Sequence, residues 1–188
     1  MRRTEKALRD AIIALMRKKP YADIQISEIA GQAQVSRPTF YLHHQSKDEL
    51  LLAVVDDAFE LFFSELVEDA LQSDYSKQTI CTLLFRHWER HHDKLNLIAK
   101  ADIQSEILKR FHTYLSHMFT FIKTQTGKPL ADGHALEMMT AYMSGGTYAL
   151  LTLWGIQKLP YTPEQMGLFL HQLSLTHEDI TLEAPAEK

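Results

Sequence analysis

Residues 26–41 read Ile26-Ser-Glu-Ile29-Ala30-Gly-Gln-Ala33-Gln34-Val35-Ser36-Arg37-Pro38-Thr39-Phe40-Tyr41, and this stretch decides the fold. Ile26, Ile29 and Ala33 share one face at helical spacing, and Phe40 returns to the same core from a second short helix. Val35 fills the connection between the two patterns. Two short helices joined in this way are typical of a helix-turn-helix, which places its second helix in the DNA major groove.

The second helix has a clear start signal. Ser36 can act as an N-cap that accepts a hydrogen bond from the backbone N–H of Thr39. Pro38 falls in the first turn, where its missing N–H costs little. The sequence therefore predicts a helix that begins near Arg37. Its exposed face would carry Arg37, Thr39, Tyr41 and His43.

Residues 26–51 resemble the DNA-binding end of the TetR family of transcriptional regulators. The resemblance rests on the helix-turn-helix pattern, the Thr39-Phe40-Tyr41 triplet and the helix start Ser46-Lys47-Asp48-Glu49-Leu50-Leu51, all close to the N-terminus. It implies an all-α protein with a three-helix DNA-binding domain at residues 1–47. Residues 48–188 would then form a helical domain for effector binding and dimerisation.

Three positions depart from the usual family pattern. Gln34 replaces a common turn glycine, Gln25 replaces a threonine before the first short helix, and His44 replaces a phenylalanine. If the turn keeps the family's left-handed geometry, Gln34 costs on the order of 1 kcal/mol relative to glycine. We therefore expect a weaker turn in an unchanged fold.

The charge of the chain is unevenly distributed. Its formal net charge is −4, yet residues 1–47 hold nine Lys and Arg against four Asp and Glu, a balance of +5. Residues 48–188 hold eleven against twenty, a balance of −9. This asymmetry predicts that the N-terminal end meets a polyanion and that the acidic remainder faces away from it.

Composition points to a cytoplasmic protein. The single Cys81 cannot form an internal disulfide, which favours a reducing compartment. Arg2 and Arg3 are followed by further charged residues rather than by the apolar segment of a secretion signal. No run approaches the ~18 apolar residues of a membrane helix, so we expect no membrane partner.

Helical periodicity continues along the rest of the chain. Ser46 offers an N-cap, with Glu49 as a capping-box partner, for a long helix. Together with the two short helices, the patterns predict about nine helices and no credible strand pair. The others are expected at residues 4–18, 46–71, 77–92, 93–100, 103–124, 131–157 and 164–176.

The candidate DNA contacts lie in and around the helix-turn-helix. Arg37 and Thr39 can reach base edges, and an arginine fits the O6 and N7 acceptors of guanine. The resemblance implies that Ser27 touches bases or backbone, and that Tyr41, His43 and Lys47 hold phosphates, which orient a protein without reading sequence. The predicted set is Ser27, Ser36, Arg37, Pro38, Thr39, Tyr41, His43 and Lys47.

No metal site, cofactor or enzymatic activity is predicted. His87 and His91 have the i,i+4 spacing that can hold a metal, but no carboxylate at a fitting spacing is evident in the sequence. The dipole of a helix end also favours histidines there. Gly145-Gly146 lies inside a helix, so it is not a phosphate loop. A nucleophile, a base and an orienting group do not occur at any recognisable spacing.

Aromatic and methionine residues of the C-terminal helices are the candidate ligand contacts. In the family, such helices enclose an inducer pocket, and large apolar or adaptable side chains are suited to line one. The same residue types also build ordinary cores. The candidates are Phe59, Phe62, Trp88, Met118, Phe119, Met139, Tyr142, Met143 and Trp154.

Gly145 and Gly146 lie in the middle of the most apolar predicted helix. Two glycines inside a helix cost about 1 kcal/mol each relative to alanine, so close approach of another helix is expected there. One stripe of this helix contains Ala135, Met138, Tyr142, Gly145, Ala149 and Thr152, and another contains Leu136, Met139, Met143, Thr147, Leu150 and Trp154. One stripe is expected to face the domain core and the other a partner subunit. A glycine pair that packs only within the monomer, or that marks a kink, is the alternative.

These observations predict a homodimeric transcriptional regulator that binds a pseudo-palindromic operator in double-stranded DNA. By default it would act as a repressor, released when a small apolar effector binds the C-terminal domain. The alternative is a regulator whose C-terminal domain docks a protein partner instead of a small molecule.

Overall fold

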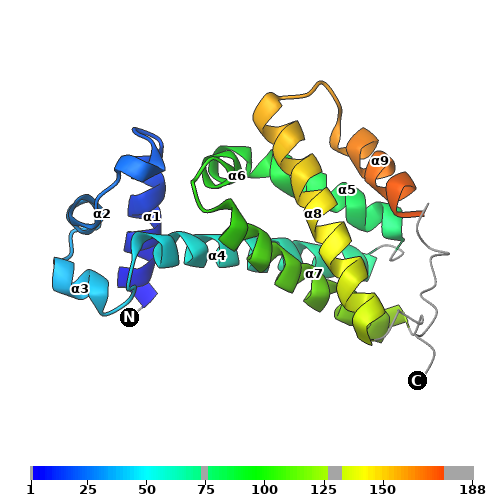
Figure 1. Cartoon of the computed structure of the whole chain (residues 1–188), viewed down its shortest axis with the longest axis horizontal. Coiled ribbons are helices and arrows are strands. Elements are labelled where there is room, and N and C mark those ends of the chain that lie inside the picture. Colours follow the sequence, from blue (N-terminus) through cyan, green and yellow to red (C-terminus); the bar gives the residue numbers. More distant parts are fainter. Residues whose placement is uncertain (1, 73–75, 127–132, 176–188) are drawn as a thin grey trace, which may run out of the picture. The chain divides into compact units, whose positions relative to one another are not determined.

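The computed structural model describes residues 2–72, 76–126 and 133–175, and every regular element in these ranges is a helix (Figure 1). The described residues contain nine α-helices and one 3-10 helix, which confirms the all-α prediction. In chain order they are α1 (Arg2–Met16), η1 (Tyr21–Asp23), α2 (Ile26–Gln32), α3 (Arg37–Tyr41), α4 (Lys47–Gln72), α5 (Lys77–Arg90), α6 (His92–Ala99), α7 (Gln104–Thr126), α8 (Gly133–Gln157) and α9 (Pro163–Leu175).

The expected helix positions agree with these bounds to within a few residues. Two predicted ends, at residues 131 and 176, lie outside the described residues. The helix η1 was not predicted, because three residues are too few to show a periodic pattern. Within the described ranges, no helix combines the length and the apolar character needed to cross a membrane.

The chain divides into two compact units. One combines Met1–Ser64 with His91–Arg110, and the other combines Glu65–Arg90 with Phe111–Lys188. The long helices α4 and α7 each contribute to both units. The division into domains at residues 1–47 and 48–188 stays a prediction.

The first unit is built around the helix-turn-helix. Burial of apolar side chains, worth roughly 1.5–3 kcal/mol for each large one, holds α1, α2 and α3 to the start of α4. As the sequence pattern predicted, Ile29 and Phe40 are fully buried in this core. The other side chains that are at most 1% exposed in this part are Leu8, Ile12, Ile24, Leu50, Leu51 and Val54.

The start of α4 carries the expected capping interactions. Ser46 Oγ accepts a hydrogen bond from the backbone N–H of Glu49 at 3.1 Å. The Glu49 carboxylate accepts one from the backbone N–H of Gln45 at 2.7 Å. The predicted N-cap is confirmed, with Glu49 reaching back one residue further than in the standard capping box.

In the second unit, α5 packs against α9 and α8 (Figure 1). Phe85 of α5 meets Trp154 of α8 edge to face, with ring centroids 5.4 Å apart. The Trp154 indole N–H donates to the backbone carbonyl of Tyr161 at 2.9 Å, which holds the connection to α9. At the α5–α9 contact, Gly167 is buried directly against Thr82.

The buried face of α8 coincides with neither predicted stripe, although it shares Thr147 and Trp154 with the second one. It contains the polar residues Thr140, Ser144 and Thr147, followed by Leu151 and Trp154. Thr140 Oγ1 donates to the carbonyl of Leu136 at 2.8 Å, and Ser144 Oγ donates to that of Ala141 at 3.0 Å. Because these hydroxyls bond to their own helix, they can be buried, and an apolar pattern cannot reveal them.

Candidate nucleic-acid interface

The turn between α2 and α3 has the expected left-handed residue. Gln34 has φ 57°, which confirms the geometry inferred from its replacement of a turn glycine. Its backbone N–H donates to the Gly31 carbonyl at 3.1 Å, and that of Val35 donates to the Ala30 carbonyl at 2.9 Å. These two bonds are those of a Schellman motif, so the end of α2 sets the direction in which the chain enters α3.

The start of α3 is also as predicted. Ser36 has extended backbone angles, and its Oγ accepts from the Thr39 N–H at 3.1 Å. Pro38 lies in the first turn. Arg37 follows the cap directly and is exposed, and Tyr41 is 49% exposed on the same short helix. The exposed residues of the predicted set are Ser27, Ser36, Arg37, Pro38 and Tyr41.

Thr39 and His43 are less accessible than the sequence suggested. The Thr39 hydroxyl shares a 2.7 Å hydrogen bond with Ser36 Oγ and the residue is half-buried. The His43 side chain is 9% exposed, and its Nδ1 lies 3.4 Å from the Glu5 carboxylate of α1. Because α3 is only five residues long, His43 lies beyond its end and folds back toward α1 rather than continuing its exposed face.

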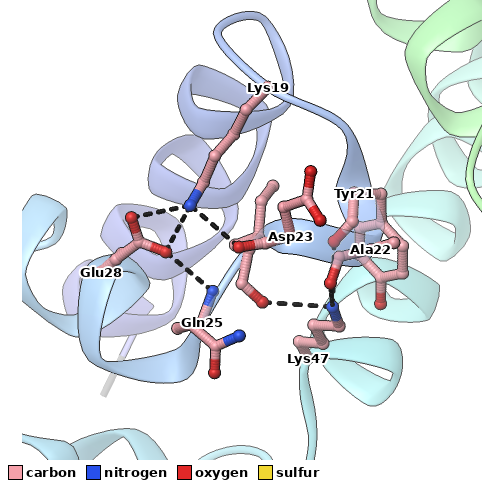
Figure 2. Close-up of polar contacts among 8 residues, drawn as sticks. Lys19, Tyr21, Ala22, Asp23, Gln25, Glu28 and Lys47 are labelled. Atoms are coloured by element: carbon pink, nitrogen blue, oxygen red, sulfur yellow. Dashed lines mark hydrogen bonds and ion pairs between the residues drawn. The ribbon is translucent and has the colours of Figure 1, made fainter.

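Lys47, expected to hold a phosphate, has its ammonium directed at the protein itself. Its Nζ donates to the carbonyl oxygens of Tyr21, Ala22 and Ile24 at 2.9, 3.0 and 3.1 Å (Figure 2). The ammonium also lies 4.6 Å from the centre of the Tyr21 ring, a cation–π distance. The phosphate contact stays a prediction, but it would have to compete with these bonds.

A second lysine, Lys19, holds the same turn and was not predicted to have a role. Its Nζ donates to the Asp23 carbonyl at 2.9 Å and to both carboxylate oxygens of Glu28 at 2.7 and 2.6 Å (Figure 2). The Glu28 carboxylate also accepts from the Gln25 N–H at 2.9 Å, which caps α2. A nine-residue separation between Lys19 and Glu28 follows no helical period, so only the folded chain reveals this pair.

His44, which replaces a phenylalanine of the family pattern, introduces a pH-sensitive group into the first unit. It is 7% exposed and packs beside Phe40 with ring centroids 6.1 Å apart. Its Nε2 has no hydrogen-bond partner among the described residues. Burial holds the pKa of His44 below its usual value of 6.5; the charges of Arg9 and His43 act in the same direction, and those of Glu49 and Glu5 oppose it.

This lowered pKa predicts a loss of stability in acid. Below about pH 6.5 the unfolded chain binds a proton at His44 that the folded chain resists, so stability falls as the pH drops toward the folded-state pKa. Between about pH 7.5 and about pH 5.5, the melting temperature of the wild-type protein should fall further than that of His44→Phe. His117→Phe, at an exposed histidine of α7, is the control. Equal losses in wild type and His44→Phe would contradict the assignment.

The candidate ligand contacts differ widely in burial. Phe62, Trp88, Met118 and Trp154 are buried, while Phe59, Phe119, Met139 and Met143 are half-buried. Tyr142 is 64% exposed, so within one chain it lines a surface rather than an enclosed site. Tyr148, which was not predicted, has a buried hydroxyl with no hydrogen-bond partner among the described residues.

His87 is engaged by a carboxylate that the sequence did not indicate. Its Nδ1 lies 2.7 Å from Glu65 Oε2, and the other Glu65 oxygen lies 2.8 Å from Arg90 Nη1. Glu65 belongs to α4, so no spacing along α5 could reveal it. This trio joins the end of α4 to α5 through one carboxylate between two basic groups.

A left-handed turn, a capped short helix and an exposed arginine on a basic N-terminal end define a helix-turn-helix DNA-binding protein. Residues 8–54 match the family model described as bacterial regulatory proteins, tetR family. This N-terminal region is therefore similar to the DNA-binding region of the TetR family of transcriptional regulators.

One relative extends this similarity over most of the chain, and another over about half of it. The fatty acid metabolism regulator protein of Bacillus subtilis is 25% identical over 164 residues, which cover 81% of this chain and 84% of that protein. The dhaKLM operon transcriptional activator DhaS of Lactococcus lactis is 35% identical over 89 residues, covering 47% of this chain and 44% of DhaS. This second alignment therefore covers less than half of each of the two proteins.

A solved structure shows the same fold. Thermus thermophilus FadR, a TetR-family repressor in complex with lauroyl-CoA, superposes with a TM-score of 0.62 at 18% identity, covering 98% of this chain and 99% of FadR.

Proposed function

We propose that the protein is a homodimeric, ligand-responsive regulator that binds a pseudo-palindromic operator, acting by default as a repressor. The observation that carries this proposal is Arg37, exposed in the first turn of the capped helix α3 on the basic end of the chain. Two copies of α3, about 34 Å apart, would enter successive major grooves. Arg37 would read a guanine, while Ser27, Ser36, Pro38, Thr39, Tyr41 and His43 would add base or backbone contacts.

The outward faces of α8 and α9 support dimerisation. Large apolar side chains are exposed on both helices. A Cβ added at Gly145 or Gly146 would meet no atom of the described residues within 4 Å, apart from its own stretch of helix. Packing within the monomer therefore does not explain the two glycines, and α8 is continuous through them. A partner subunit would cover Met138, Tyr142, Leu153, Leu168, Phe169 and Leu173.

The proposed effector is a molecule with a large apolar part. The described interior of the second unit contains Trp88, Met118 and Trp154, and the unpaired hydroxyl of Tyr148 would gain a hydrogen bond from a polar group of the effector. Thermus thermophilus FadR, which shares this fold, binds lauroyl-CoA in its solved structure. Long-chain acyl-CoA is therefore the first class to test. Such a ligand can weaken operator binding only if it binds the released form of the protein more tightly than the DNA-binding form.

Arg37→Ala tests the DNA-binding part of this proposal. Loss of a bidentate contact to guanine should cost about 1–3 kcal/mol of binding free energy per half-site and relax the base preference at one position of each half-site. Selection from random-sequence DNA, followed by titration of the enriched duplex, measures both. Arg17→Ala removes an equal charge outside α3 and should leave the enriched motif unchanged. The role of Arg37 is refuted if its variant enriches the wild-type motif.

The alternative function, docking of a protein partner by the C-terminal helices, also has a specific observation in its favour. The exposed apolar side chains of α8 and α9 could serve another protein as well as a second copy of this chain. Thermal denaturation with lauroyl-CoA and with free CoA separates the two. A melting temperature raised by the acyl-CoA alone supports an effector site, because a ligand that binds the folded state stabilises it.

A further inference from the structure

Two lysines donate hydrogen bonds to the turn before α2, which consists of residues 21–24. Residues 21–24 offer four backbone carbonyls to Lys19 and Lys47, three of them to Lys47 alone (Figure 2). Lys19 follows α1 and Lys47 is the first residue of α4. The hydroxyl of Tyr21 in the same turn donates to the Asp48 carboxylate, so the first two residues of α4 both hold this turn.

The bonds of Lys47 occupy all the donors that it has. A lysine ammonium carries three N–H groups, and three carbonyl oxygens lie at 2.9–3.1 Å from Lys47 Nζ. A phosphate oxygen could bind only if one of these bonds broke. The position also requires an internal partner, because a cation in the first turn of a helix is disfavoured by the helix dipole. The three carbonyls supply the compensating negative potential.

The hydrogen bonds of the two lysines to this turn also restrain the helix-turn-helix. Gln25 directly follows residues 21–24, and α2 begins at the next residue. The Gln25 N–H donates a hydrogen bond to the Glu28 carboxylate. Lys19 binds that same Glu28 carboxylate. A continuous set of polar contacts therefore runs from the start of α4, through η1, to the first turn of α2, entirely within the first unit.

We propose that Lys47 is a positioning residue, which fixes the helix-turn-helix to the start of α4 through the carbonyls of residues 21–24, and that it is not a phosphate ligand. This inference rests on the proposed DNA-binding function and replaces the role that the resemblance implied for Lys47. The shape of the group matters as well as its charge. A compact ammonium can aim three donors at three carbonyls, whereas the flat fork of an arginine cannot.

The test compares Lys47→Met and Lys47→Arg with Lys18→Met, which removes one exposed positive charge from the same unit. The DNA probes are the duplex that wild-type protein enriches from random-sequence DNA and a scrambled duplex of equal length. Titrations are made over a range of salt concentrations, at a temperature where every variant is folded. We expect the melting temperatures of both Lys47 variants to lie about 4 °C or more below that of the wild-type protein. Lys18→Met should lower the melting temperature by less.

In the DNA titrations, Lys47→Met should bind the enriched duplex about tenfold more weakly. Its affinity for the scrambled duplex and its slope of log affinity against log salt should not change, because no phosphate contact is lost. Lys47→Arg should be equally impaired. A phosphate ligand predicts the opposite pattern. The slope would be shallower in Lys47→Met by about 0.9 for each subunit, or about 1.8 for the dimer, and arginine would restore binding fully.

Several results would overturn the inference: the shallower slope, rescue by arginine, or unchanged binding of the enriched duplex. If Lys47→Met does not fold, Lys47→Arg alone decides, since it keeps the charge that a phosphate needs. If wild-type protein enriches no duplex, the proposed function fails instead. The melting temperatures of the three variants then still show whether the Lys47 hydrogen bonds to residues 21–24 stabilise the protein.

Discussion

Replacing Gly167 with alanine should lower the free energy of unfolding by about 2 kcal/mol, because the new methyl group overpacks the contact between α9 and α5. An added Cβ would lie 2.5 Å from Thr82 Cα and 2.7 Å from the Thr82 backbone nitrogen. These are backbone atoms, which cannot rotate aside as a side chain does. The two helices would have to separate, and neighbouring contacts such as that between Arg86 and Glu164 would be disturbed.

The opposite sign is expected where a helical glycine has open space. A Cβ added at Gly31 in α2 would meet no atom of the described residues within 4 Å, apart from its own stretch of helix. Gly31→Ala should therefore raise stability by up to about 1 kcal/mol, the difference in helix propensity between the two residues. Urea denaturation of both variants measures the contrast. A Gly167→Ala midpoint at or above that of wild type would show that α5 and α9 do not pack this closely.

Gly145→Leu should convert the protein from dimer to monomer at micromolar concentration. A Cβ added at this position meets open space among the described residues, so we expect the chain to fold still, with the leucine side chain projecting into the face proposed to bind a second copy. Loss of the dimer separates the two DNA-reading helices. Affinity for a full palindrome should then fall by about 10²-fold or more, because the second half-site no longer binds as part of one complex.

Sedimentation and DNA titration together test this result. Binding to a single half-site should be unchanged, since α2 and α3 are not altered. Thr120→Leu adds the same side chain at an exposed position of α7 and should remain dimeric. A Gly145→Leu protein that is folded, dimeric and bound to the palindrome with wild-type affinity would contradict the proposed interface.

Local signals explain why the DNA-reading motif could be predicted. The Ser36 cap, the first-turn Pro38 and the left-handed Gln34 act over at most five residues, so their geometry depends mainly on the chain nearby. Apolar spacing likewise places Ile29 and Phe40 in the core. The number of helices follows from the same periodic patterns, since each long helix buries at least one face.

Contacts between distant segments could not be predicted in this way. Sequence spacing does not connect Lys47 to the carbonyls of residues 21–24, nor Glu65 to His87, nor Gly167 to Thr82. The buried residues Thr140 and Ser144 of α8 were missed for a related reason: a polar residue can enter a core when its own helix accepts its hydrogen bond.

The sequence by itself determined the all-α fold, the helix-turn-helix and the end of the chain that carries positive charge, because capping, turn geometry and periodicity are local properties. The tertiary structure decided which of those charges remain available. Arg37 stays exposed at the start of α3, whereas Lys19 and Lys47 are engaged by a turn formed from other segments. A basic side chain is available to DNA only if it is not already bonded to a carbonyl or carboxylate of the folded chain. Whether it is bonded in this way depends on how the helices pack.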